Sequence, residues 1–206
     1  MKRIALMLSA SLALVACGSS PEPHYFALAS TTGPVLDDVR AVVRIQRPFL
    51  AGYLDRPDLV RQDRDFQVEM DSADRWAEPL DTMFERILMQ DLQQRLPAAA
   101  IVAEDSGMPA AARFTLTIAI QQFNAIAQDQ TALQAQLTIR DKGAHEQPLP
   151  EQIHLTADSG TSPTDDAQHL SALVGQLADR IAVSLHNQML KPEKAPTSPA
   201  VLRLED

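Results

Sequence analysis

The chain has 206 residues, of which 45% are apolar, and this is enough for one domain with a hydrophobic core. Its formal net charge is −9 at pH 7, and a surface of this sign repels phosphate backbones, which argues against nucleic-acid binding. Cys17 is the only cysteine, so the chain forms no internal disulfide.

The first residues have the layout of a secretory signal peptide. Lys2 and Arg3 precede an uncharged apolar run at 4–13, which is shorter than the roughly 20 apolar residues that a membrane span requires. The next residues, Leu-Val-Ala-Cys-Gly, resemble the bacterial lipobox, in which the cysteine is acylated and becomes the first residue of the mature protein. We therefore expect a covalent lipid on Cys17 and no other cofactor. The alternative is an ordinary signal peptide that contains a cysteine.

A lipid on Cys17 would hold the chain at a membrane by acyl chains alone, because an acidic surface gains nothing from anionic lipid. Residues 17–23 form the expected tether, and the six residues after the cysteine reach at most about 20 Å. In enterobacterial lipoproteins an Asp after the cysteine favours the inner membrane. By that resemblance Gly18 favours the outer membrane, with the body facing the periplasm.

Alternating apolar and polar residues predict strands along much of the body. The segments are 39–45, a hairpin with arms at 59–62 and 66–70, a short edge strand at 101–103, and longer strands at 114–121, 133–140 and 152–156. Each longer strand has one apolar face and one polar face, which is typical of an antiparallel sheet covered on one side only.

Two amphipathic helices supply the expected cover. The first spans 74–96, and because proline is tolerated only in a first turn, Pro79 predicts a start between Asp74 and Glu78. The second spans 164–190, with Thr164 as the expected cap and two aspartates in its first turn. The predicted fold class is α+β, a two-layer sandwich of a mostly antiparallel sheet with two long helices on one face. The domain covers 24–190, and a Pro-rich disordered tail covers 191–206.

No catalytic constellation is visible in the sequence. It has no Gly-x-Ser-x-Gly elbow, no His-Glu-x-x-His helix and no Cys/His cluster. Asp165 or Asp166 with His169 offers a two-ligand metal corner, but such acids at a helix start are usually capping residues. We predict a protein that is not an enzyme and binds no metal. The polar face of the sheet, rich in Gln and Thr, fits either a partner protein or water.

Three motifs in a fixed order carry a resemblance to a known family. After the lipobox come Tyr25-Phe26-x-Leu28, then Tyr-Leu-Asp-Arg-Pro-Asp-Leu-Val at 53–60, then Arg-Trp-Ala-Glu-Pro-Leu at 75–80. This order resembles the PqiC (YmbA-type) family, the auxiliary lipoproteins of ABC-type, MCE-linked transport systems, over residues 17–190. The Tyr25-Phe26 pair departs mildly from the commoner Tyr-Tyr, and the Pro-rich tail lies outside the resemblance.

The resemblance implies a non-enzymatic outer-membrane lipoprotein that docks the periplasmic conduit of a lipid transport system. Its implied partner is an MCE-domain protein, and because such proteins form rings, a homo-oligomer of this chain is a further possibility. The implied partner-binding residues are Tyr53, Leu54, Arg56, Pro57 and Trp76. The segments Tyr53–Leu59 and Trp76–Leu80 could equally be core and turn residues, and for Trp76 a place in the core is the stronger expectation. A structural or assembly lipoprotein of another outer-membrane machine is the alternative function.

Overall fold

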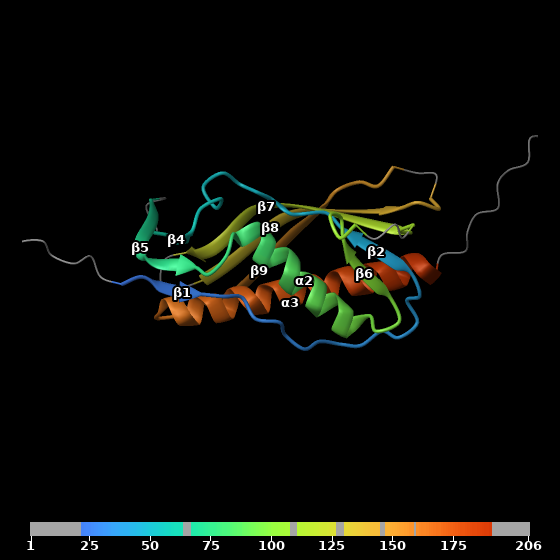
Figure 1. Cartoon of the computed structure of the whole chain (residues 1–206), viewed down its shortest axis with the longest axis horizontal. Coiled ribbons are helices and arrows are strands. Elements are labelled where there is room, and N and C mark those ends of the chain that lie inside the picture. The colour runs from blue at the N-terminus through green and yellow to red at the C-terminus, as the bar shows by residue number, and fades with distance from the viewer. Residues whose placement is uncertain are drawn as a thin grey trace, which may run out of the picture.

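The computed structural model of the chain describes residues 22–63, 67–107, 111–126, 130–144, 147–158 and 160–190. The predicted signal peptide, Cys17, most of the tether, Phe66 of the predicted hairpin and the Pro-rich tail lie outside these residues. Figure 1 shows a long twisted sheet with two helices running along one of its faces.

β7 (Phe114–Ile126) is the central strand of the sheet. One of its edges pairs antiparallel with β8 (Gln130–Asp141) along the whole strand, and β8 pairs antiparallel with β9 (Glu151–Asp158). The three longer strands predicted from alternation are therefore confirmed. Their apolar positions, such as Phe114, Leu116 and Leu133, are fully buried.

The other edge of β7 pairs with three short strands from one stretch of chain. β2 (Val42–Ile45), β3 (Phe49–Leu50) and β4 (Asp58–Gln62) follow one another along this edge, each parallel to β7. Loops at 46–48 and 51–57 separate these strands. The sheet is therefore mixed, with long antiparallel ladders and short parallel ones.

The sheet branches beyond this edge. β2 pairs in parallel with β6 (Ala100–Ala103), which ends the sheet there, as the predicted edge strand requires. β4 pairs antiparallel with β5 (Val68–Trp76), which confirms the predicted hairpin, and β5 pairs in parallel with β1 (His24–Phe26).

α2 (Leu80–Arg95) and α3 (Pro163–Leu190) cover one face of the sheet, which confirms the predicted two-layer α+β fold (Figure 1). The ring of Phe84 on α2 meets the ring of Phe123 on β7 edge to face, with centroids 5.4 Å apart. Within the described residues, neither helix is apolar enough over a sufficient length to cross a bilayer.

The predicted start of the first helix is wrong. Residues 74–76 belong to β5 rather than to the helix, because β1 pairs with them and the Trp76 amide donates to the Pro57 carbonyl at 2.7 Å. Pro79 has an extended backbone and caps the helix, which begins at Leu80. Trp76 fits the apolar spacing of the helix, but strand pairing with distant residues determines its conformation.

Thr164 does not cap the second helix, because the helix already begins at Pro163. The cap is Ser162, whose hydroxyl accepts the Asp165 amide at 3.2 Å while the Asp165 carboxylate accepts the Ser162 amide at 3.1 Å. Proline suits the first helical position because its missing N–H would have no partner there. The hydrogen bonds from Ser162, followed by those from Thr161, lower the pKa of the Asp165 carboxyl.

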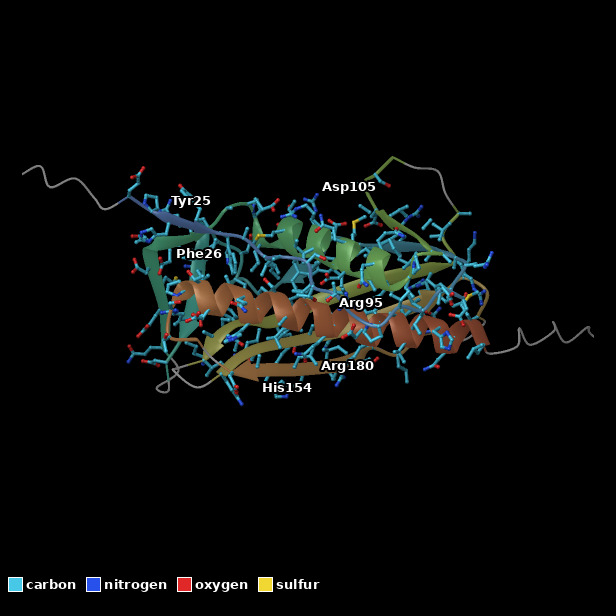
Figure 2. The ribbon with its side chains drawn as sticks, turned by 90° about the horizontal axis from the view of Figure 1, so that it is seen from below. Tyr25, Phe26, Arg95, Asp105, His154 and Arg180 are labelled. Carbon is cyan, nitrogen blue, oxygen red and sulfur yellow. The ribbon has the colours of Figure 1, made fainter. Side chains whose placement is uncertain are left out.

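A group of polar and charged side chains around the buried residues Asp91 and Arg95 fixes the segment that follows β1, and we call it the N-terminal clamp. It consists of Ser30, Thr31, Asp91, Arg95 and Asp179. Asp91 accepts the Ser30 hydroxyl and the Thr31 amide, both at 2.7 Å. Arg95 donates to the Thr31 carbonyl at 2.9 Å and pairs with Asp179, so it joins the segment to α2 and α3. Figure 2 shows Arg95 between the two helices.

Two glycines allow the N-terminal segment to approach the helices closely. A Cβ at Gly175 of α3 would overlap the Thr31 hydroxyl, and a Cβ at Gly33 would overlap the Arg95 and Asp179 side chains. The Gly33 amide also donates to Gln94 at 3.0 Å. The path from the N-terminus into the body is therefore set by close contacts over residues 27–36.

Candidate partner-binding surface

The face of β7, β8 and β9 that lies opposite the helices, which we call the open face, carries mainly neutral polar side chains. It consists of Thr115, Thr117, Gln122, Gln134, Gln136, Thr138, Gln152, His154 and Thr156, all exposed or half-buried. The strand register places Gln134 beside both Gln122 and His154, and Gln136 beside Gln152. The predicted Gln- and Thr-rich face therefore exists as one continuous surface across three strands.

One end of the open face is hollowed next to the loop at 51–57. This glutamine hollow has a volume of about 360 Å³ and is lined by Tyr53, Gln62, Val68, Gln121, Gln122 and Gln134. Gln122 and Gln62 are at the limit of hydrogen bonding, 3.5 Å apart, so their amides are weakly held. The hollow offers amide donors and acceptors beside two larger apolar surfaces, those of Tyr53 and Val68.

The loop at 51–57 positions Tyr53 because it folds back on itself between β3 and β4. The Leu54 amide donates to the Ala51 carbonyl at 2.8 Å, and the Leu54 side chain, 1% exposed, enters the core. With Leu54 inside, the neighbouring Tyr53 turns toward the open face. Its hydroxyl lies 3.2 Å from both the Gln121 carbonyl and the Asn124 amide oxygen, and burial raises the pKa of this phenol.

The five residues implied for partner binding have different environments in the structure. Leu54 and Trp76 are core residues, with exposures of 1% and 5%, so neither is available to a partner in this conformation. Arg56 is half-buried against the Met70 sulfur, and Pro57 is exposed on the same loop. Tyr53 alone of the five lines the glutamine hollow.

The two aspartates considered for a metal corner have structural roles in the fold. Asp165 caps α3, and Asp166 is buried and accepts the Arg61 guanidinium at 2.8 Å. Across the described part of the chain, no group of three or more His, Cys, Asp or Glu side chains is placed to hold a metal ion.

The sequence did not predict that the residues of the glutamine hollow lie together. Alternation placed Gln134 on the polar face, but it could not place that side chain beside Val68 and Tyr53, which come from a hairpin and a loop on the other edge of β7. The available signal was the run Gln121-Gln122, where alternation fails. A β-bulge lies there, between Ile120 and Gln122, and bulges mark places where a strand redirects its side chains.

Comparison with known proteins identifies the family of the chain and relates its fold to solved structures. The family model described as "ABC-type transport auxiliary lipoprotein component" matches residues 26–182. A solved structure of a Xanthomonas campestris protein from the DUF330 family is similar at a TM-score of 0.65 and 13% identity, over 81% of this chain and 96% of that chain. Another, of an uncharacterized protein, is similar at a TM-score of 0.62 and 16% identity, over 82% of this chain and 99% of that chain. No curated protein matches the sequence. At these identities the two structures establish a shared fold.

Proposed function

This chain belongs to the family of ABC-type transport auxiliary lipoprotein components, and from that premise we propose that it is the non-enzymatic outer-membrane subunit of an MCE-linked lipid transport system. In this role it docks the periplasmic conduit formed by an MCE-domain protein. The observation that carries the proposal is the open face, a continuous and mainly neutral polar surface that the helices leave uncovered because they pack on the opposite side of the sheet.

The anchor in this proposal is a lipid on Cys17. The tether between Cys17 and β1 is short, so the body stays within about 20 Å of the membrane surface. This confinement raises the effective concentration of the body for any partner that reaches the membrane. The N-terminal clamp supports the proposal because it joins the chain from the anchor to both helices. The orientation of the anchored end relative to the sheet is thereby fixed.

The docking surface in this proposal is the open face together with the glutamine hollow. Neutral amides and hydroxyls lose less on desolvation than charges do, so they suit an interface that forms and separates. Tyr53 and Val68 give the hollow the larger side chains that partner surfaces use as anchors, since aromatic groups dominate many interfaces.

Site-specific photocrosslinking in the native cell envelope tests the docking surface. A photoreactive amino acid at Gln134, in the hollow, is expected to capture an MCE-domain protein. The matched control replaces Arg180, which is exposed on α3 and labelled in Figure 2, and should give no such product. Capture of the MCE-domain protein from position 180 and not from 134 would contradict the proposed face. Capture of a secretin or porin-like barrel from 134 would favour the alternative role in assembly of another machine.

The anchor is tested separately with Cys17→Ala. Without a thiol no diacylglyceryl group can be attached, so we expect the variant to leave the outer-membrane fraction after cell fractionation. Retention of the variant with outer membranes, at the wild-type level, would show that another part of the molecule holds it there. Metabolic labelling with a fatty-acid probe provides the direct readout of the modification.

A further inference from the structure

A second pocket lies at the end of the sheet where β7 begins and β8 ends, and its charge is opposite to that of the molecule. It has a volume of about 450 Å³, and four cationic side chains line it, those of Arg44, Arg113, Arg140 and Lys142. Among the described lining residues, Asp141 is the one carboxylate. We call these five residues the basic pocket. This local excess of positive charge contrasts with the formal net charge of −9 for the chain.

The sheet itself holds the cations side by side. Arg44 of β2 is directly opposite Thr115 of β7, and Thr115 is directly opposite Arg140 of β8. The two arginines therefore flank one small side chain, on the face that points away from the helices. Since neighbouring strands lie about 4.8 Å apart, the two side chains start about 10 Å apart and can reach one ligand between them.

Backbone hydrogen bonds fix the main chain at the other two basic residues, Arg113 and Lys142. The Arg113 amide donates to the Val42 carbonyl at 3.0 Å, and the Lys142 amide donates to the Arg113 carbonyl at 2.8 Å. The Arg113 guanidinium lies over the Phe114 ring, with its central carbon 5.0 Å from the ring centroid. The pocket is therefore built on the ends of paired strands, where side-chain positions are better defined than on a free loop.

The basic residues Arg113, Arg140 and Lys142 of the pocket differ in whether an ion pair already holds them. Asp141 pairs with Arg113 at 3.3 Å and also accepts the Gly143 amide at 2.9 Å, so much of its hydrogen-bonding capacity is in use. Arg140 and Lys142 are exposed, and neither has an ion pair with any residue in the described part of the chain. A ligand can therefore bind Arg140 and Lys142 without breaking an ion pair.

We propose that the basic pocket binds a small phosphate ester, with the phosphate group between the guanidinium groups. Arginine forks match the oxygens of a phosphate in a bidentate way, and three arginines with one lysine favour such an anion over a neutral solute. The pocket is larger than one phosphate needs, and Ala111, Ala112, Ala144 and Pro148 give it apolar walls. A phosphate that carries a glycerol-sized group fits this combination, whether it comes from a phospholipid headgroup or from a free metabolite.

This inference goes beyond the docking role and does not depend on it. The pocket lies near β2, at the end of the molecule far from β1 and the N-terminus (Figure 1). A body moored through its N-terminal end would therefore present the basic pocket away from its own anchor. The acidic surface elsewhere opposes the approach of anions, so binding should weaken as salt rises and should be modest in strength.

Isothermal titration calorimetry on the full chain in neutral detergent tests the proposal. The probes are glycerophosphoglycerol, the water-soluble headgroup of phosphatidylglycerol, then inorganic phosphate, and sodium chloride at matched ionic strength. We expect saturable binding of both phosphate probes and none of chloride. Arg140→Gln should weaken phosphate binding about tenfold, since it removes a charge-assisted contact. The matched control, Arg180→Gln, removes the same charge from an exposed site and should change binding less than about twofold.

Each result decides for or against the site. Tighter binding of glycerophosphoglycerol than of phosphate supports a lipid headgroup as ligand, and equal binding supports a free phosphate compound. Heats no larger than those of chloride, or equal weakening by the two variants, would overturn the proposal. Binding of hexaglutamate with no binding of the phosphate probes would also overturn it, because the surface would then accept an acidic peptide. All of these results can occur whether or not an MCE-domain protein is captured at Gln134.

Discussion

The N-terminal clamp and the basic pocket use the same residue types in opposite ways. Arg95 in the clamp is 1% exposed and is hydrogen-bonded or paired to Thr31 and Asp179. Arg140 in the pocket is exposed and has no ion pair within the described chain. Removing a buried, fully partnered charge leaves its partners unsatisfied, whereas removing an exposed charge costs the fold almost nothing. Arg95 therefore stabilises the fold, whereas Arg140 is free to bind a ligand.

The largest expected difference is in the free energy of unfolding. Arg95→Ala leaves the buried Asp91 without its cation, and breaking such a group typically costs about 3–5 kcal/mol. Arg140→Ala should stay within about 0.5 kcal/mol of wild type, as exposed substitutions usually do. Urea denaturation followed by circular dichroism measures both values. Equal effects of the two substitutions would show that the clamp is not a stabilising unit.

A smaller effect is expected from crowding the clamp without removing a charge. Gly33→Ala places a methyl group against Arg95 and Asp179 and should cost about 1–3 kcal/mol, as overpacking does. Gly52→Ala is the matched control, because nothing lies within 4 Å of a Cβ at that position. It should leave the free energy of unfolding unchanged or raise it by about 0.4–1 kcal/mol, because alanine lowers the conformational entropy of the unfolded chain. A loss at Gly52 as large as the loss at Gly33 would show that backbone conformation, not contact with the clamp, causes the effect.

The smallest expected effect is a change in how stability depends on pH. Burial raises the pKa of the Asp91 carboxyl above its ordinary value of 3.8, against the opposing hydrogen bonds from Ser30 and Thr31. The folded chain then holds this proton more tightly than the unfolded chain. The contribution of Asp91 to stability therefore falls as pH rises above 3.8, and becomes constant above the raised pKa.

Asp91→Asn removes this titration, so the stability of wild type minus that of the variant should decrease with pH across the same window. Urea midpoints measured from about pH 3 to about pH 7 give the difference. A difference that increases with pH would show that Arg95 and the hydrogen bonds outweigh burial, and that the carboxylate is the favoured form.

Local patterns in the sequence predicted most of the elements. Strict alternation identified β7, β8 and β9, since successive side chains of a strand point to opposite faces and only one face of these strands is buried. The apolar stripe identified α2 and α3 but failed at Trp76, where the pairing of β5 with β1 overrides the helical spacing. The bounds of elements depend on distant partners, and these are not visible in a local window.

The clamp and both pockets could not be predicted, because each joins segments far apart in the sequence. Asp91 and Arg95 continue the spacing of the apolar stripe, so charged residues there were a signal of buried partners. Their partners Ser30, Thr31 and Asp179 lie roughly 60 to 85 residues away. The basic pocket likewise depends on the register between β2, β7 and β8. A shift of one residue would move Arg44 or Arg140 to the covered face.

The shortness of β1 has a mechanical consequence. Tension applied at the N-terminus first meets a strand of three residues, whose detachment frees about 10 Å of chain. Of these residues only Phe26 packs against the core, because Tyr25 is already 63% exposed. Further extension is then resisted at Ser30 and Thr31, where Arg95 distributes the load over both helices. A body held in this way can follow small movements of the surface to which it is attached without unfolding.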